Sequence, residues 1–250
     1  GRNGGVLSSF GHHMKFSLKN NVIPMLTTKK VAFKTCAKEL FWFIRGQTDN
    51  SILREQNVHI WDGNGSKEFL ESRGLSHYPE HDLGPIYGFQ WRRFNAPYKG
   101  TEYNYDNDDD NKDQLQYVID SLMDKTDEGM ESRRLIVSAW NPQQLDEMAL
   151  PPCHVLFQFK ANREKRTLDC ALYQRSGDVG LGVPFNIASY SLLTHIIAHH
   201  CGLKANEFNH FLADAHIYED HIEPLREQIE RECFDFPTIE ITEKHENIND

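Results

Sequence analysis

The segment IASYSLLTHIIAHHC, residues 187–201, limits the fold more than any other part of the sequence. Wound as a helix it is apolar on nearly every side, and Gly202 follows at the position where helices commonly end. Such a helix is stable only where other elements cover it all round. We therefore expect a buried central helix, in a core that 250 residues with 39% hydrophobic content are sufficient to build.

Helical and strand patterns mingle along the rest of the chain. A helix is predicted at 35–45, ending before Gly46, and another from Leu115 to Met123, behind the acidic segment 103–113, which we interpret as a solvated loop. Strands are predicted at 135–140, 155–159 and 167–173. Since these elements show no regular βαβ alternation, the pattern favours a single-domain α+β fold over a doubly wound one.

The composition argues against some classes of protein. A formal net charge of −10 disfavours nonspecific nucleic-acid binding, which depends on broad positive potential. No stretch reaches the length that crosses a bilayer, and no secretory signal is visible. Five cysteines without a CxxC pair are typical of reduced thiols rather than of a disulfide framework. We therefore expect a cytoplasmic location and no membrane association.

A lone cysteine lies in an unusual setting in LPPCHVLFQF, residues 150–159. The two prolines before Cys153 fix the backbone torsion angles and exclude a helix there. The mostly apolar run that follows favours a strand. Cys153 is thus held at a rigid strand entrance, where it could be either inert packing or a nucleophile.

Arginines form the most plausible anion site. Arg133 and Arg134 stand together before a predicted strand, and Arg175 lies in QRSGD. Guanidinium groups bind phosphate with two parallel hydrogen bonds. Taken alone, each of these arginines is more often a solvated surface residue.

Other polar residues could bind a nucleotide. The amide of Asn186, at the start of the predicted central helix, could pair with the N3–H and O4 edge of uracil, or could cap that helix. His216 and Tyr218 point the same way if their segment is extended, and both could hydrogen-bond a sugar hydroxyl or one another.

Three further signals are not interpreted as functional. The GLG at 180–182 lacks the strand-then-helix context of a dinucleotide fingerprint. His195 and His199 lie four residues apart, but neither an HExxH glutamate nor a third ligand is in view, so no metal is expected. Cys36 and Cys201 fit apolar helix patterns and are predicted to lie in the core.

Together these pieces resemble the thymidylate synthase family. LPPCHVLFQF is similar to the family's nucleophile segment, and YQRSGDVGLGVPFNIASY to its nucleotide-binding stretch in the eukaryotic form. Further blocks match in the family's order, namely LTTKK, ELFWFIRG, IWDGNGS, DLGPIYGFQWR, SRRLIVSAWNP and DAHIYEDHIEPL. The resemblance runs from about Arg2 to the C-terminal end. It implies one domain over 1–250, with a mixed sheet packed with helices and a sheet face that forms a dimer interface.

The reaction implied by the resemblance is the reductive methylation of dUMP to dTMP, with 5,10-methylenetetrahydrofolate as carbon and hydride donor. Cys153 would add to C6 of uracil, since C5 is a poor nucleophile until this occurs. Arg175 would supply the positive charge that favours a thiolate. Asn186 would hydrogen-bond the charge developing on O4 and select uracil over cytosine.

The resemblance also implies residues for proton transfer and binding. Glu39 and Tyr87 would move protons through ordered water, and burial of Glu39 beside Phe41 and Trp42 could bring its pKa near the operating pH. His154 would order solvent. The implied dUMP site comprises Arg2, Arg133, Arg134, Cys153, His154, Gln174, Arg175, Ser176, Gly177, Asp178, Asn186, His216 and Tyr218. The implied folate site comprises Ile60, Trp61, Asn64, Asp178, Leu181, Gly182 and Phe185.

Members of this family are obligate homodimers in which each site borrows two arginines from its neighbour, here Arg133 and Arg134. The match departs from the family in a shorter N-terminal loop around Arg2, in Ala32 near the folate and in Gly63, where alanine is common. The N-terminal start and the C-terminal closing tail are expected to be missing from this sequence. A fused dihydrofolate reductase domain upstream is one expectation, and a short leader is another.

Two other functions compete with this one. A pyrimidine nucleotide 5-hydroxymethylase would share the thiolate and the folate carbon, but cytidylate members carry aspartate at the position of Asn186. A catalytically retired homologue that only binds nucleotide or RNA would be expected to lack part of the catalytic set. No such gap is found, and the acidic charge disfavours RNA.

Overall fold

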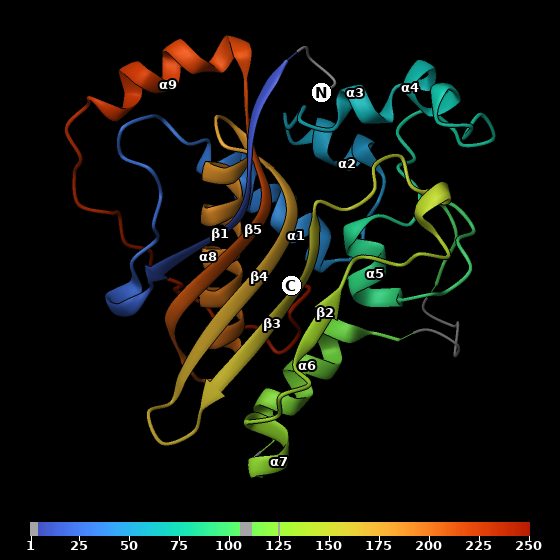
Figure 1. Ribbon diagram of the computed structural model, residues 1–250. Helices are drawn as coiled ribbons and strands as arrows, with labels where there is room; N and C mark the ends of the chain where they lie inside the picture. The colour runs from blue at the N-terminus through green and yellow to red at the C-terminus, as the bar shows by residue number, and fades with distance from the viewer. Residues whose placement is uncertain (1–4, 106–111, 125) are drawn as a thin grey trace.

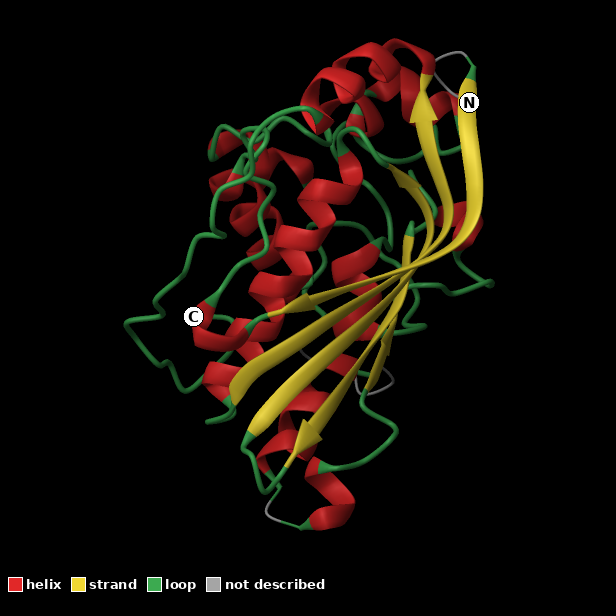
Figure 2. Cartoon of the chain, turned by 60° about the vertical axis from the view of Figure 1, so that its left-hand side comes forward, coloured by secondary structure: helices red, strands yellow, loops and turns green. Residues whose placement is uncertain are grey.

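The computed structural model describes residues 5–105, 112–124 and 126–250. These residues form a mixed sheet in the order β1-β5-β4-β3-β2, with helices gathered mainly on one side of it (Figures 1 and 2). The strands are β1 (Val6–Ser17), β2 (Ile136–Ser138), β3 (His154–Asn162), β4 (Thr167–Asp178) and β5 (Lys204–Tyr218). β4 and β5 run parallel, and the other neighbouring pairs run antiparallel. The α+β prediction is confirmed.

The helices differ widely in length. They are α1 (Phe33–Ile44), α2 (Asn50–Glu55), α3 (Asp62–Gly65), α4 (Lys67–Ser72), α5 (Tyr87–Arg93), α6 (Gln114–Met123), α7 (Asp127–Met130), α8 (Gly182–His200) and α9 (Ile222–Ile229). Short 3-10 turns lie at Lys19–Asn21, Leu145–Glu147 and Glu219–His221. Of the helices in the described ranges, none combines the length and apolar character that crossing a bilayer requires.

Helix α8 is the buried central helix that the sequence predicts. It packs against β4 and β5 on one side and against α1 on the other. It ends before Gly202, whose φ of 68° is the left-handed conformation usual after a helix. Its start was predicted too late, at residue 187, because the continuous apolar run begins there; the helix begins at Gly182, and Pro184 lies in its first turn, where proline is tolerated. The segment 180–182 therefore does lie between a strand and a helix, contrary to the prediction.

The other predicted elements are present with shifted ends. Helix α1 ends just before Gly46, and α6 buries its apolar stripe except for Met123, which is 54% exposed. Strand β4 continues five residues beyond the predicted end, through the polar residues 174–178. Cys36 and Cys201 are buried, as expected.

Both flanks of the acidic segment are anchored, so its interpretation as a solvated loop is wrong at its ends. Tyr105 is buried with its ring edge-on to that of Phe89. Asp113 caps α6 by accepting from the Gln116 amide, and it pairs with Arg92 at 2.8 Å. Residues 106–111 lie outside the described residues.

The sheet face away from α8 carries large side chains that the described part of the chain leaves half-exposed. Ile136 is 39% exposed, Tyr173 43% and Phe211 41%. Tyr173 and Phe211 are direct neighbours across β4 and β5. Contiguous apolar side chains on an open sheet face are typical of an interaction surface. The predicted dimer interface at this face stays a prediction.

We expect Gly88→Ala to destabilise the protein, because α5 approaches α1 very closely there. A Cβ on Gly88 would lie 2.8 Å from the Phe43 carbonyl oxygen and 3.0 Å from its Cα. Relieving such an overlap costs about 1–3 kcal/mol. Gly63→Ala is the matched control, since a Cβ on Gly63 meets nothing within 4 Å. Urea unfolding at one protein concentration measures both, and equal stability of the two variants would contradict the close contact.

Candidate active site

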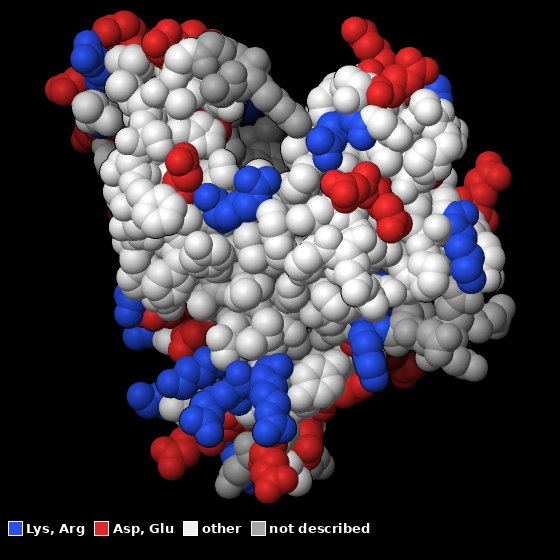
Figure 3. Space-filling view, turned by 45° about the vertical axis from the view of Figure 1, so that its right-hand side comes forward, with Lys and Arg blue, Asp and Glu red and all other residues white. Residues whose placement is uncertain are grey.

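A cavity of about 890 Å³ opens where β3 begins and β4 and β5 end. Residues of α1, α3, α5 and the first turns of α8 also line it. Figure 3 shows the hollow at the upper edge of the view, between two lobes. The predicted site residues that it brings together are Glu39, Ile60, Trp61, Asn64, Tyr87, Cys153, His154, Gln174, Arg175, Ser176, Gly177, Asp178, Leu181, Gly182, Phe185, Asn186, His216 and Tyr218.

Arg175 holds the segment that presents Cys153. Its Nη2 and Nε donate to the carbonyl oxygens of Pro151 and Pro152, both at 2.9 Å. Its backbone N–H donates to the Cys153 carbonyl, also at 2.9 Å. Nη2 lies 3.9 Å from the Cys153 Sγ, and the guanidinium is 5.6 Å from the centre of the Trp140 ring. The structure thus places a guanidinium group, held by two backbone carbonyls, beside the sulfur.

A β-bulge separates the cysteine from the regular part of β3. The pairing of β3 with β4 shifts between His154 and Leu156, which leaves one extra residue on β3. Bulges commonly redirect side chains next to active sites. Here the shift allows Cys153 and the adjacent His154 both to line the cavity.

Tyr87 faces Cys153 from α5. Its Oη accepts a 2.8 Å hydrogen bond from the Cys153 backbone N–H. Burial raises the pKa of Tyr87 well above its ordinary value, so the phenol keeps its proton. Because the oxygen accepts from the backbone, the hydroxyl hydrogen is available to another acceptor in the cavity.

Glu39 is a buried carboxyl group, 7% exposed. It accepts a 2.7 Å hydrogen bond from Trp61 Nε1. Burial raises the pKa of Glu39 to about 7, against the opposing effect of this bond. The expectation that Phe41 would bury it is wrong, because Phe41 is 41% exposed and lies on the other face of α1. A carboxyl group with this pKa can both accept and release a proton near neutral pH.

His154 is neutral for the same physical reason with the opposite sign. Burial and, to a smaller extent, the neighbouring His210 lower its pKa to about 3, against the opposing effect of a hydrogen bond with Asn186. Its ring lies edge-on to that of Tyr190, with centroids 5.1 Å apart. His154 thus offers the cavity a neutral imidazole rather than a cation.

Asn186 lies inside α8 rather than at its start, so the helix-cap alternative is wrong. It is 8% exposed, and its Oδ1 accepts a 3.0 Å hydrogen bond from Gln174 Nε2. A buried amide held in this way presents defined donors and acceptors to the cavity.

Asp178 and the end of β5 complete the opposite wall. Asp178 Oδ1 accepts from the backbone N–H groups of Gly180 at 2.8 Å and Leu181 at 3.3 Å, which ties the turn between β4 and α8. His216 and Tyr218 both line the cavity from the extended strand, as expected. Their rings meet edge-on at 5.4 Å, and His216 Nδ1 lies 3.2 Å from Asp214.

With this geometry established, comparison with known proteins gives a consistent result. A family model described as thymidylate synthase matches residues 2–250. The chain belongs to the thymidylate synthase family. It is 52% identical over 246 residues to the thymidylate synthase of Homo sapiens, covering 98% of this chain and 76% of that protein. Against the thymidylate synthase of Ascaris suum it is 52% identical over 246 residues, 98% and 81% of the two chains.

The family also includes longer relatives. The bifunctional dihydrofolate reductase-thymidylate synthase of Leishmania amazonensis is 51% identical over 246 residues, which is 98% of this chain. The chain spans 46% of that relative's length.

Some site residues expected from the family resemblance are not brought together. Arg133 and Arg134 are exposed before β2 and do not line the cavity of their own chain. Arg2 lies outside the described residues. Conversely, Phe43, Leu150 and Pro151 line the cavity although they were not predicted. Phe43 follows Glu39 by four residues, so helical spacing could have identified it.

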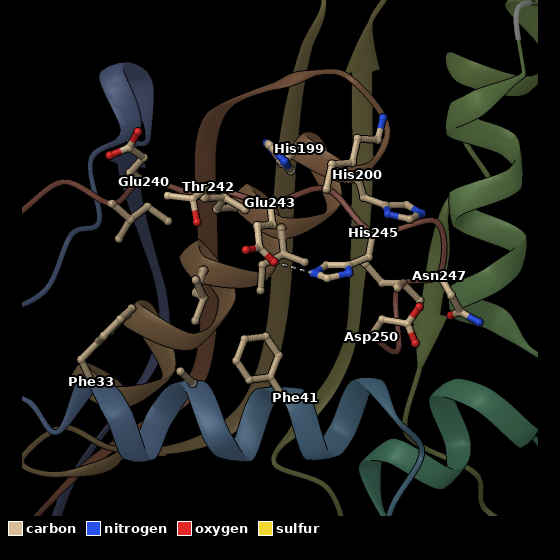
Figure 4. A pocket seen from close by; sticks show the side chains of 17 residues that line it. Phe33, Phe41, His199, His200, Glu240, Thr242, Glu243, His245, Asn247 and Asp250 are labelled. Carbon is tan, nitrogen blue, oxygen red and sulfur yellow. Dashed lines mark ion pairs between the residues drawn. The ribbon is translucent and has the colours of Figure 1, made fainter.

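A second cavity, of about 480 Å³, lies between α1, α8 and the C-terminal segment 239–250 (Figure 4). Phe33 and Phe41 contribute apolar surface from α1, and His199, His200 and His245 lie around it. No cysteine is among the described residues that line it. Cys153 lines the first cavity, which is therefore the candidate active site.

Within the described ranges, no group of three or more His, Cys, Asp or Glu side chains is placed to hold a metal ion. His195 Nε2 donates a 2.8 Å hydrogen bond to the Val22 carbonyl oxygen, so this nitrogen carries a hydrogen.

The raised pKa of Glu39 predicts a pH-dependent stability. The unfolded chain releases this proton near 4.5 and the folded one near about 7, so the free energy of unfolding falls as pH rises between these values. Glu39→Gln keeps the oxygen that accepts from Trp61 but stays neutral. Relative to wild type it should gain on the order of 2–3 kcal/mol between about pH 4.5 and pH 8.

Urea unfolding at several pH values measures this gain. Glu80→Gln on the exposed surface is the matched control and should show no comparable change. A Glu39→Gln difference that stays constant with pH would contradict the raised pKa.

Proposed function

We propose that this chain catalyses the thymidylate synthase reaction, in which dUMP and 5,10-methylenetetrahydrofolate give dTMP and dihydrofolate. One observation carries the proposal, namely that a thiol, a guanidinium, a fixed amide and a carboxyl group of pKa about 7 share one cavity. The names of the relatives from Homo sapiens and Ascaris suum support it.

In the first step the Cys153 thiolate adds to C6 of the uracil ring. The new S–C6 bond moves an electron pair through C5 toward O4, and C5 becomes the nucleophile that the reaction needs. Arg175 stabilises the thiolate before the addition. Its bonds to Pro151 and Pro152 keep it in place, so little reorganisation is required.

Asn186 stabilises the charge on O4. Its NH₂ group donates to O4, and Oδ1 has a second lone pair for N3–H. A hydrogen bond that strengthens as the charge develops lowers the barrier rather than only improving binding.

Protons move through Glu39 and Tyr87. With a pKa of about 7, Glu39 exchanges protons near neutral pH, and the Tyr87 hydroxyl can donate or relay next to Cys153. Neutral His154 orients solvent between them. These groups allow the C5 proton to leave once the carbon unit is attached.

The nucleotide's other parts fit the remaining residues of the cavity. His216 and Tyr218, which both line the cavity, are assigned to the sugar hydroxyl. Gln174, Ser176 and Gly177 line the side next to Arg175, where the nucleotide is bound. The phosphate is assigned to Arg175 together with Arg133 and Arg134 of the partner subunit, with Arg2 as a further proposed ligand.

The folate co-substrate supplies the one-carbon unit and a hydride. One observation supports a folate site in this cavity. Ile60 and Leu181 are apolar side chains that line the cavity, yet they are 47% and 60% exposed. A flat ring system would cover them, together with Trp61 and Phe185. Asn64, Asp178 and Gly182 supply the polar edge.

The active protein is proposed to be a homodimer through the open sheet face. The half-exposed Tyr173 and Phe211 there support this assembly. Arg133 and Arg134 do not line their own cavity, which is in keeping with donation to the neighbour. A fused dihydrofolate reductase domain, a closing tail and a cytoplasmic location stay predictions; the bifunctional relatives support the first.

We expect dihydrofolate to form with dUMP but not with dCMP when the full chain is given methylenetetrahydrofolate, as followed by absorbance.

Cys153→Ser should retain dUMP binding and lose on the order of a thousandfold or more in turnover. Cys233→Ser changes an exposed cysteine and should match wild type. A 5-hydroxymethyl nucleotide without dihydrofolate would indicate the hydroxymethylase, and dUMP binding without either product a retired homologue.

Sharing of arginines predicts complementation between two inactive chains. Arg134→Ala and Cys153→Ala variants should each be nearly inactive alone, whereas a mixed dimer can assemble one intact site. Co-refolding at equal amounts should therefore restore up to about a quarter of wild-type activity, since half the dimers are mixed and each has one site. Activity no higher than either parent would contradict sharing.

A further inference from the structure

Behind Asn186 lies a chain of hydrogen bonds that the mechanism does not use. His210 Nε2 and Gln174 Oε1 are 2.7 Å apart. Gln174 Nε2 donates to the Ser176 carbonyl oxygen at 2.9 Å and to Asn186 Oδ1 at 3.0 Å. His210 is fully buried and Gln174 is 2% exposed. The chain therefore runs from the protein interior to a residue of the candidate active site.

The Ser176 carbonyl oxygen determines which atoms donate and which accept along this chain of hydrogen bonds. A backbone carbonyl can only accept, so the Gln174 atom beside Ser176 is the NH₂ group. Gln174 Oε1 then faces His210, whose Nε2 has to carry the hydrogen. The second Gln174 hydrogen points to Asn186, which has to present its oxygen. By elimination, the Asn186 NH₂ group lies on the other side of its amide.

His210 can fix the direction of these hydrogen bonds because its ring adopts one protonation state and one tautomer. Burial lowers its pKa to about 4, so the ring is neutral near pH 7 and carries one hydrogen. Its Nδ1 has no hydrogen-bond partner in the described part of the chain. The bond to Gln174 therefore selects the Nε2–H tautomer.

The hydrogen-bond partners of Gln174 favour one orientation of its amide. A turned amide would place its oxygen against the oxygens of Ser176 and Asn186, which both accept from Gln174 in the observed orientation.

We propose that His210 is a positioning residue for pyrimidine selection, which acts through Gln174 to keep the Asn186 NH₂ group toward O4 of uracil. The inference rests on the proposed function for the identity of the nucleotide. Cytosine presents an NH₂ group where uracil presents O4, so it would require Asn186 to turn. Turning would set the Asn186 NH₂ against the Gln174 NH₂, so that the Gln174 hydrogen now bonded to Asn186 and the Asn186 hydrogen facing it would both lack an acceptor.

The test compares two substitutions at His210. His210→Phe keeps a buried ring but removes the donor to Gln174, whereas His210→Gln retains a side-chain N–H. The readout is the ratio of the dissociation constants for dCMP and dUMP, measured by calorimetry without folate. In His210→Phe this ratio should fall on the order of tenfold, with His210→Gln close to wild type.

If His210 had a merely structural role, His210→Phe would weaken the binding of both nucleotides alike and leave the ratio unchanged. That result would overturn the proposal. An equal fall in both variants would also overturn it, because the donor would then be irrelevant. If His210→Phe does not fold, Gln174→Met provides the second test. It removes the bonds from Gln174 to His210 and to Asn186, which together form the relay. An unchanged ratio in Gln174→Met would count against the proposal equally.

The wild-type chain separates this inference from the proposed function. If it binds dUMP over dCMP but forms no dihydrofolate, the reaction is wrong while the ratio still tests the relay. If it forms dihydrofolate and the variants keep the wild-type ratio, the relay alone is wrong.

Discussion

Helix α8 has apolar side chains on nearly every side, so the sheet has to cover one side of it and α1 the other. In chain order it connects β4 to β5, which run parallel, and its first turns follow directly on the end of β4. The polar residues at 174–178, the start of α8 and the end of β5 are thereby brought to the same end of the sheet. The position of the cavity is a consequence of burying this one helix.

Burial then acts in opposite directions on the acids and bases of the site. It raises the pKa of Glu39 to about 7 and lowers those of His154 and His210 to about 3 and about 4. All three groups can therefore be neutral near pH 7. The environment that allows Glu39 to exchange a proton also fixes the hydrogen of His210 on one nitrogen. Burial thus accounts both for the raised pKa of Glu39 and for the neutral ring of His210.

Much of the fold could be predicted from apolar periodicity, and the errors lie where periodicity is lost. The end of β4 was missed because residues 174–178 are polar, although they continue the strand. The start of α8 was missed because the continuous apolar run begins only at Ile187, and Asn186 was therefore placed at the start of the helix. Tyr105 was assigned to a solvated loop because its neighbours are acidic, yet Phe89 and Tyr98 cover its ring.

By itself the sequence determined the family and the class of fold, and it predicted most of the residues that line the larger cavity, because apolar spacing and local motifs such as LPPCH are written in consecutive residues. Only the tertiary structure decided that Phe41 turns away from the site while Trp61 reaches Glu39, and that His210 meets Gln174. These contacts join residues 22 and 36 positions apart. Their donors, acceptors and degree of burial depend on how the elements pack in space, which no local pattern specifies.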